Sequence, residues 1–304
     1  DSTERGLVVV TGASSQIGVF LLPRLVESGF RVQAVSRRAA VKPLVLESGP
    51  VWMSPEDALK PETHSTESAN WLISAGPASL ASQLLERNPR FNKVVQFTTT
   101  SILTKSQSAN TAERDLVNRI VRQETRLKDL CARHNVPLVI LRPTLIYGCG
   151  MDKNLTRLWH WGNRTGFIPV ASQSDGLRQP VHADDLAGLA AGALVTETGS
   201  LLESAACGGS TLSYREMAEA TALSCHRKIR VVALPAGIFA AGVQMLSWFG
   251  VAGVNSEMVR RQALDMVFED SILREKLIYR PRPFQPSAKD FSIPVKLAGF
   301  QLPG

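Results

Sequence analysis

The sequence predicts an α/β protein: a doubly wound, Rossmann-like parallel sheet with a smaller C-terminal substrate-binding region. Two observations support this fold class. Short apolar runs alternate with longer amphipathic stretches in the first half of the chain, which is typical of parallel sheets covered on both faces. The first apolar run, residues 8–10, also leads directly into a glycine-containing turn and a helix. Ligands of such folds bind beyond the carboxyl ends of the strands.

The turn after residues 8–10 predicts a dinucleotide site. Gly12 begins a turn too tight for a side chain, and Gly18 lies where the next helix must approach the sheet closely. The amides at that helix N-terminus favour a pyrophosphate, although Ser15 replaces the usual middle glycine. An ordinary strand-to-helix turn is the alternative. We expect cofactor contacts from Thr11, Gly12, Ser14, Ser15, Gln16, Ile17 and Gly18.

The end of the second predicted strand, residues 30–35, indicates which dinucleotide is bound. An acidic residue usually stands there in NAD-selective folds and binds the ribose hydroxyls. This chain has Ser36, Arg37 and Arg38 instead. Because guanidinium groups bind phosphate through charge-assisted hydrogen bonds, the sequence favours NADP(H) over NAD(H). A solvated basic loop is the alternative.

The remaining elements follow the same alternation. Strands are predicted at residues 51–53, 70–74, 93–97 and 138–141, and helices near 55–59 and 112–134. The strand end at Ser74, Ala75 and Gly76 is expected to meet the adenine or its ribose, with a plain turn as the alternative. From about Cys149 the pattern loosens into short elements. We therefore expect a dinucleotide-binding domain at residues 1–148 and a mainly substrate-binding region at 149–304, with some elements returning to the first domain.

Composition excludes several classes of protein. The 304 residues carry a net charge of +7, but Lys and Arg are scattered, which argues against nucleic-acid binding. The four cysteines lie far apart without metal-ligand spacing, so we expect no metal and a reduced, cytoplasmic setting. Residues 231–254 contain no charge. We expect a buried helix or helix pair there, with membrane contact as the less favoured alternative.

Three further segments resemble one family. Arg142-Pro143 with Tyr147-Gly148, the segment from Arg178 to Ala187, and residues 280–284 resemble extended or atypical short-chain dehydrogenase/reductases, in particular nucleotide-sugar epimerases and dehydratases. The resemblance implies that Pro143 contacts the cofactor, that Arg142, Tyr147 and Arg178 contact a nucleotide sugar, and that Arg178 reaches a substrate phosphate. It also implies pairing of two copies through helix 112–134. For Arg142, capping a helix or holding a loop is the alternative. For His182 and Asp185 we favour a structural role, which is to fix backbone at a strand-to-helix junction.

The sequence departs from this family at its catalytic pair. The family uses Tyr-x-x-x-Lys for proton transfer, but Tyr147, Tyr214 and Tyr279 are followed four residues later by Met151, Ala218 and Pro283. Family spacing from Glu124 places the pair at Leu116 and Ile120, which cannot transfer a proton. Ser101 matches the family's substrate-orienting hydroxyl and is our catalytic candidate. Lys105 and Asp115 are more typical of a solvated surface.

Two functions from different classes follow. The first is an NADP(H)-binding nucleotide-sugar epimerase, dehydratase or reductase with a non-standard catalytic site. The second is a non-catalytic NADP(H)-binding sensor, scaffold or accessory subunit. A membrane-surface enzyme acting on a lipid-linked substrate is a third reading, which depends on residues 231–254 alone.

Overall fold

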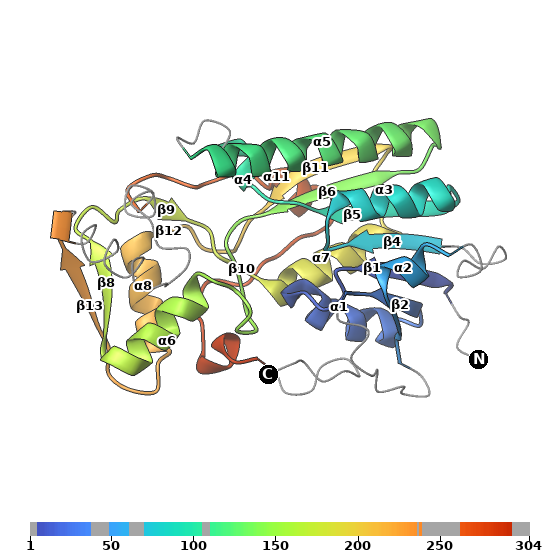
Figure 1. The fold of residues 1–304 in the computed structure, drawn as a ribbon. Coiled ribbons are helices and arrows are strands. Elements are labelled where there is room, and N and C mark those ends of the chain that lie inside the picture. The colour runs from blue at the N-terminus through green and yellow to red at the C-terminus, as the bar shows by residue number, and fades with distance from the viewer. Residues whose placement is uncertain are drawn as a thin grey trace.

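The computed structural model describes residues 5–37, 49–60, 70–104, 110–235, 237–238 and 262–293. Its centre is a seven-stranded sheet with the order β11-β6-β5-β4-β1-β2-β3 (Figure 1). All of the neighbouring strands in this sheet are parallel. The strands are β1 (Leu7–Thr11), β2 (Arg31–Val35), β3 (Val51–Met53), β4 (Asn70–Ser74), β5 (Phe91–Phe97), β6 (Leu138–Pro143) and β11 (Leu201–Ala206). The predicted fold class is confirmed.

Helices cover both faces of this sheet, as Figure 1 shows. Strand β1 illustrates why, because alternate side chains of a strand point to opposite faces. Val8 and Val10 pack with α1 (Gln16–Glu27) and α7 (Ala183–Val195) in one apolar core. Val9 packs in a second core with α3 (Ala78–Arg87) and α5 (Thr111–Arg133). A strand that is buried on both faces needs a continuous apolar run, which is the pattern read from the sequence.

Most predicted elements are confirmed with small changes at their ends. The strands at 51–53 and 70–74 match β3 and β4, and the helix near 55–59 is α2 (Pro55–Ala58). Helix 112–134 is α5. Its sequence predicts an apolar side through Leu116, Ile120, Leu127 and Cys131, and the last two of these are buried as expected. Leu116 is 50% exposed, however, because the buried line at the start of the helix passes through Val117, seven residues before Glu124.

The second half of the chain forms a smaller region beside the carboxyl ends of the strands, to the left in Figure 1. Three small sheets pair β7 (Ile146–Tyr147) with β10 (Val181–His182), β8 (Phe167–Ala171) with β13 (Arg230–Leu234), and β9 (Leu177–Arg178) with β12 (Leu212–Ser213). Its helices are α6 (Leu155–Thr165), α8 (Tyr214–Leu223) and η2 (Ala288–Phe291), whereas α11 (Ser271–Lys276) packs on β11 of the main sheet. From this half, β11 returns to the main sheet beside β6, and α7 returns to pack against α1.

The uncharged run at 231–254 is only partly visible. Its first four residues belong to strand β13, so the expectation of a helix is wrong there, because they pair with β8 over the full length of that strand. Residues 236 and 239–254 lie outside the described part of the chain. Among the residues that the structure does describe, no helix is long and apolar enough to span a bilayer.

Candidate functional site

The turn between β1 and α1 is built around close backbone contact. Gly12 has φ +65°, and a Cβ atom there would lie 2.5 Å from the carbonyl carbon of Ala75. A Cβ on Gly18 would overlap the carbonyl oxygen of Ala13. Both glycines therefore occupy positions where a side chain cannot fit, as the sequence predicts.

Ser15 explains why the middle glycine is dispensable in this turn. It is the N-cap of α1, and its Oγ accepts a hydrogen bond of 3.2 Å from the amide of Gly18. Its own amide donates to the carbonyl of Gly12 at 2.8 Å. A serine satisfies one of the free amides at the helix start, so it stabilises the helix that the cofactor turn requires.

The loop at the end of β4 is fixed by hydrogen bonds from two neighbouring strands. Thr11 Oγ1 donates to Ser74 Oγ at 2.8 Å, and Ser74 Oγ donates to the carbonyl of Gly76 at 3.3 Å. Gln96 Nε2, from β5, donates to the same carbonyl at 3.0 Å. Sequence reasoning missed Gln96, although a buried amide within the apolar strand at residues 93–97 was a readable signal. These bonds hold Ala75 and Gly76 against Gly12.

At the end of β2, the predicted phosphate-binding residues are only partly described. Ser36 is buried, and its Oγ lies 2.6 Å from the Oγ of Ser14, so the two hydroxyls share a hydrogen bond. Arg37 is exposed. Arg38 lies outside the described residues. Neither Ser36 nor Arg37 supplies the acidic group that typifies NAD-selective sites.

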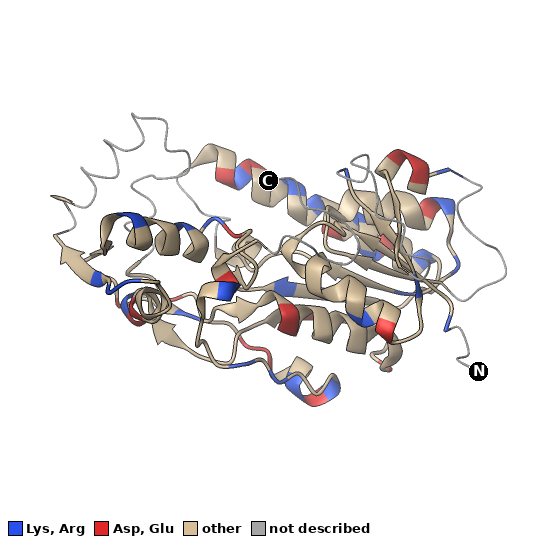
Figure 2. Ribbon diagram, turned by 90° about the horizontal axis from the view of Figure 1, so that it is seen from below, with Lys and Arg blue, Asp and Glu red and all other residues tan. Residues whose placement is uncertain are grey.

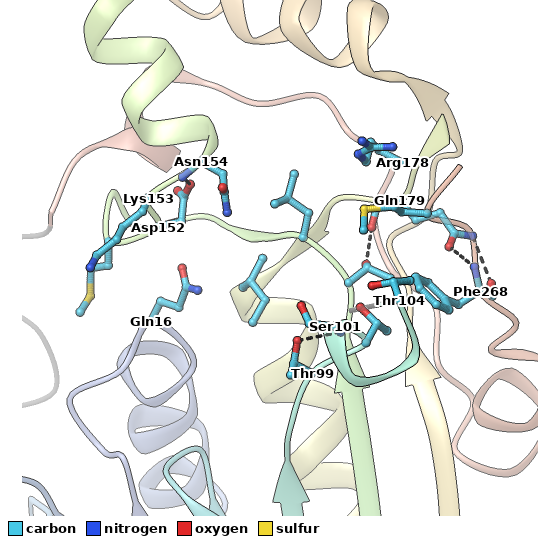
Figure 3. A pocket seen from close by; sticks show the side chains of 16 residues that line it. Gln16, Thr99, Ser101, Thr104, Asp152, Lys153, Asn154, Arg178, Gln179 and Phe268 are labelled. Atoms are coloured by element: carbon cyan, nitrogen blue, oxygen red, sulfur yellow. Dashed lines mark hydrogen bonds between the residues drawn. The ribbon is translucent and has the colours of Figure 1, made fainter. Parts of the chain in front are cut away.

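A pocket of about 410 Å³ opens beyond the carboxyl ends of the strands (Figure 3). Gln16 borders it at the N-terminus of α1, and Ser101 borders it at the start of α4 (Ser101–Thr104). Arg178 and Gln179 lie on the side opposite Lys153 and Asn154 in the view of Figure 3. The other lining residues are Thr99, Thr100, Thr104, Thr144, Leu145, Ile146, Met151, Asp152, Met266 and Phe268.

Arg178 places a cation in the pocket wall. Arg178 is only 7% exposed, and this burial lowers the pKa of its guanidinium below the ordinary value. Nη1 donates to the carbonyls of Leu177 at 2.8 Å and Leu264 at 2.6 Å, and the guanidinium lies 5.7 Å from the ring centre of Tyr214. Arginine stays charged even when buried, so the arrangement suits an anionic group.

Arg142 does not border the pocket. Its Nη2 contacts Glu124 Oε2 at 2.6 Å and Glu203 Oε2 at 2.7 Å, beneath α5. Burial opposes its charge, but these two carboxylates outweigh that effect and raise the guanidinium pKa. The geometry is that of a residue holding β6, β11 and α5 together.

Tyr147 is likewise outside the pocket lining. Its ring lies 5.0 Å from both the His182 ring and the Phe284 ring, and burial raises the pKa of its phenol. Pro143 acts through its carbonyl, which accepts hydrogen bonds from Thr100 N at 3.3 Å and Thr100 Oγ1 at 3.1 Å. That contact positions the segment that leads to Ser101.

His182 and Asp185 fix the backbone around the junction from β10 to α7, which is the structural role that we expect for them. His182 is the N-cap of α7, and its Nδ1 accepts from the amide of Asp184 at 3.1 Å. Asp185 accepts from the backbone and side chain of Arg282, both at 2.9 Å. This interpretation is confirmed.

The pocket has two ionisable residues besides Arg178, and sequence reasoning missed both. Asp152 accepts from the amides of Asn154 and Thr156 at 2.9 and 3.1 Å, so it mainly organises the start of α6. Lys153 is exposed at the rim. Leu116 and Ile120 do not line the pocket, and Lys105 lies outside the described residues.

The chain resembles known proteins in its three-dimensional fold, whereas comparisons of its sequence find no match. No family model and no curated protein matches its sequence. The UDP-glucose 4-epimerase of Thermotoga maritima, solved with UDP-glucose, superimposes with a TM-score of 0.65 at 13% identity, covering 94% of this chain and 97% of the other. The Bifidobacterium longum UDP-glucose 4-epimerase with NAD⁺ and UDP gives 0.65 at 14% identity, covering 94% and 95%.

A third similar structure contains the nucleotide of a sugar acid instead of a neutral sugar. The UDP-glucuronic acid 4-epimerase of Bacillus cereus, with UDP-glucuronic acid and NAD, gives a TM-score of 0.64 at 16% identity, covering 91% of this chain and 94% of that one. At such low identity the likeness establishes the fold. This chain therefore has, over nearly its full length, the α/β fold of the UDP-sugar epimerases.

Proposed function

We propose that the chain is an NAD(P)(H)-binding protein of the nucleotide-sugar epimerase, dehydratase or reductase type. One observation carries the proposal: a single pocket joins Gln16, from the predicted cofactor turn, to Ser101 and the buried Arg178. In an open parallel sheet this is the place for a ligand. Residues 1–148 would hold mainly the cofactor and 149–304 mainly the substrate, and both parts contribute to the pocket lining.

The cofactor would lie along the turn from Thr11 to Gly18, with Ser74, Ala75, Gly76 and Pro143 beside it. The close approach of Gly12 to Ala75 supports this, because dinucleotide turns need such bare backbone. The cofactor would supply hydride transfer. At the ribose end we propose NADP(H) rather than NAD(H), because Arg37 and Arg38 offer cations where an acid is usual.

The substrate would be a nucleotide sugar whose diphosphate lies near Arg178. The similar structures contain UDP, UDP-glucose or UDP-glucuronic acid, which supports this class of ligand. The buried guanidinium of Arg178 is the most suitable anion-binding group of the pocket wall, because a cation is strongest where water is excluded. Arg142 and Tyr147 would act indirectly, by holding strand ends.

Proton transfer would not use a Tyr–Lys pair. Ser101 would orient the substrate hydroxyl, and a second group would have to accept or donate the proton, because a hydroxyl alone is a weak base at neutral pH. Lys153 at the pocket rim is the described side chain best able to donate one.

The test combines binding and turnover. We expect calorimetric titration to detect NADPH binding, and UDP-glucose or UDP-glucuronic acid binding that is stronger with cofactor present. Turnover across a panel of UDP-sugars should fall about a hundredfold or more in Ser101→Ala, because orienting and proton-transfer groups contribute factors of this size. Turnover unchanged by Ser101→Ala would place the reaction centre elsewhere. Cofactor binding without any turnover would support the sensor or scaffold function, and absence of NADPH and NADH binding would refute the proposal.

We further propose a cytoplasmic homodimer. The four free cysteines support a reducing compartment. Leu116 and Val121 are exposed apolar side chains on α5, the helix expected to pair two copies, and Leu103 is exposed on the preceding α4. Leu116→Glu should convert a dimer to a monomer in light scattering, while an unchanged mass would exclude this face.

A further inference from the structure

The strand pair β8–β13, at the left end in Figure 1, has one face turned away from its apolar core. In the parallel pair β8–β13, Arg230 is in register with Phe167, and Val232 with Pro169. Their neighbours Ile168, Val170 and Val231 pack inward against α8. Because side chains alternate along a strand, the residues opposite to that core share the outer face of the pair. Phe167 remains 38% and Val232 37% exposed there.

Arg230 shares this outer face with Phe167 and Val232, and three further cations stand within three residues of Phe167 or Arg230 along the chain. Arg164, Arg227, Lys228 and Arg230 are all exposed. Three hydrogen bonds hold the segments that carry them together: Arg227 Nη1 to Asn163 O at 3.5 Å, His226 N to Asn163 Oδ1 at 3.1 Å, and Arg230 N to Gly166 O at 3.2 Å. We call this set of side chains the basic tip; it consists of Arg164, Phe167, Arg227, Lys228, Arg230 and Val232.

No acidic group balances the basic tip within its own segments. Residues 155–171 and 223–235 contain no Asp or Glu, and β13, at the left end in Figures 1 and 2, carries no acidic residue. None of the four cations forms an ion pair with another described residue. Glu219, on α8 one turn before Leu223, is the nearest acid along that helix. The tip therefore has a local positive charge.

We propose that the basic tip binds peripherally to an anionic membrane surface. Anionic headgroups attract exposed Lys and Arg, and exposed aromatic or aliphatic side chains enter the boundary between headgroups and acyl chains. A nucleic-acid backbone or an acidic peptide would use the same charges but would gain nothing from Phe167 and Val232. The combination of both kinds of side chain in these two joined segments favours lipid. This inference is independent of the pocket and of its ligand.

Vesicle flotation of the whole chain tests the proposal directly. The protein should float with vesicles of phosphatidylcholine and phosphatidylglycerol, stay behind with phosphatidylcholine alone, and be released by high salt. Each cation is expected to change the partition coefficient about fivefold, so Arg227→Gln with Arg230→Gln should reduce it about 25-fold. Arg87→Gln with Arg90→Gln, two exposed cations on and just after α3, is the matched control and should change little.

A second variant separates lipid from other polyanions. Phe167→Ser with Val232→Ser should weaken vesicle binding while leaving any binding to a DNA duplex unchanged. Thermal unfolding should be the same in all variants, which checks their folding without reference to the pocket. Equal flotation with both kinds of vesicle, or flotation that neither double variant reduces, would overturn the proposal. So would a DNA duplex that binds as strongly as the anionic vesicles. If a variant fails to fold, the proposal is tested by the unmutated protein alone, through the dependence of its flotation on anionic lipid and on salt.

Discussion

Gly12 lies so close to Ala75 that the two backbones leave no room for a Cβ atom, which would come within 2.5 Å of the Ala75 carbonyl carbon. This contact joins the end of β1 to the end of β4, and the hydrogen bonds of Ser74 and Gln96 hold it in place. It fixes the distance between the ends of two strands at the proposed cofactor site.

Replacing Gly12 should therefore abolish cofactor binding. Gly12→Ala adds a clash with backbone and also places a side chain at φ +65°. Gly29→Ala is the matched control, because Gly29 has φ +83° but open space around the added atom. The control should lose about 1 kcal/mol of stability from its backbone conformation and keep its NADPH affinity. Calorimetry on folded Gly12→Ala that shows unchanged NADPH binding would contradict the assignment of this turn.

Replacing Arg37 and Arg38 with Ala tests the cofactor preference. Hydrogen bonds to charged groups are worth about 1.5–3 kcal/mol, so NADP(H) affinity should fall about tenfold to a hundredfold or more, and NAD(H) affinity should change little. Calorimetric titration of both cofactors measures the difference. Equal affinity of the unmutated protein for NADPH and NADH would be evidence against NADP(H) selection.

The two buried arginines should respond differently to the same substitution. Arg178→Gln should weaken UDP-sugar binding about tenfold to a hundredfold, because it removes the cation from the pocket wall. Arg142→Gln should instead lower the free energy of unfolding by about 3 kcal/mol, because Glu124 and Glu203 lose their shared partner. Denaturant titration and calorimetry on both variants separate the two effects. Weaker UDP-sugar binding in folded Arg142→Gln would show that it contacts substrate.

We expect the folded protein to lose stability in acid, because Asp184 then becomes protonated. Partial burial opposes its ionisation, but hydrogen bonds from Arg24 and Arg282 outweigh this and hold the pKa of the carboxyl below its ordinary 3.8. The folded state then binds this proton less readily than the unfolded state. The contribution is complete above about pH 4 and is lost as the pH falls through the lower, folded pKa.

Removing Arg24 and Arg282, the partners of Asp184, should make the stability of the protein less sensitive to acid. Arg24→Ala with Arg282→Ala should lower stability at neutral pH by about 1 kcal/mol, since both arginines are substantially exposed, and should narrow the difference between neutral and strongly acidic pH. Thermal unfolding over this pH range measures both quantities. The pair Arg87→Ala with Arg90→Ala should leave the pH profile as it is, and an identical change in both variants would indicate a general charge effect.

Much of the site's backbone could be predicted from the sequence, because local patterns determine it. Gly12 and Gly18 are required by steric contacts within and beside one turn, and Ser15 is a good helix cap wherever it stands. Gln96 was missed since its partner, the carbonyl of Gly76, comes from a neighbouring strand. The cofactor, substrate and catalytic roles assigned to these residues stay predictions.

By itself, the sequence determined the fold class, six of the seven central strands, and the absence of a Tyr-x-x-x-Lys pair, whereas β11 was missed. Periodicity and residue type carry that information, since strands and helices bury their side chains with different repeats. Only the tertiary structure decided that Arg178 lines the pocket while Arg142 holds two carboxylates. It also decided which line of α5 is buried, and that Arg230 shares the outer face of the β8–β13 pair with Phe167 and Val232. The reason is that these outcomes depend on contacts between segments far apart in the chain, which no local pattern encodes.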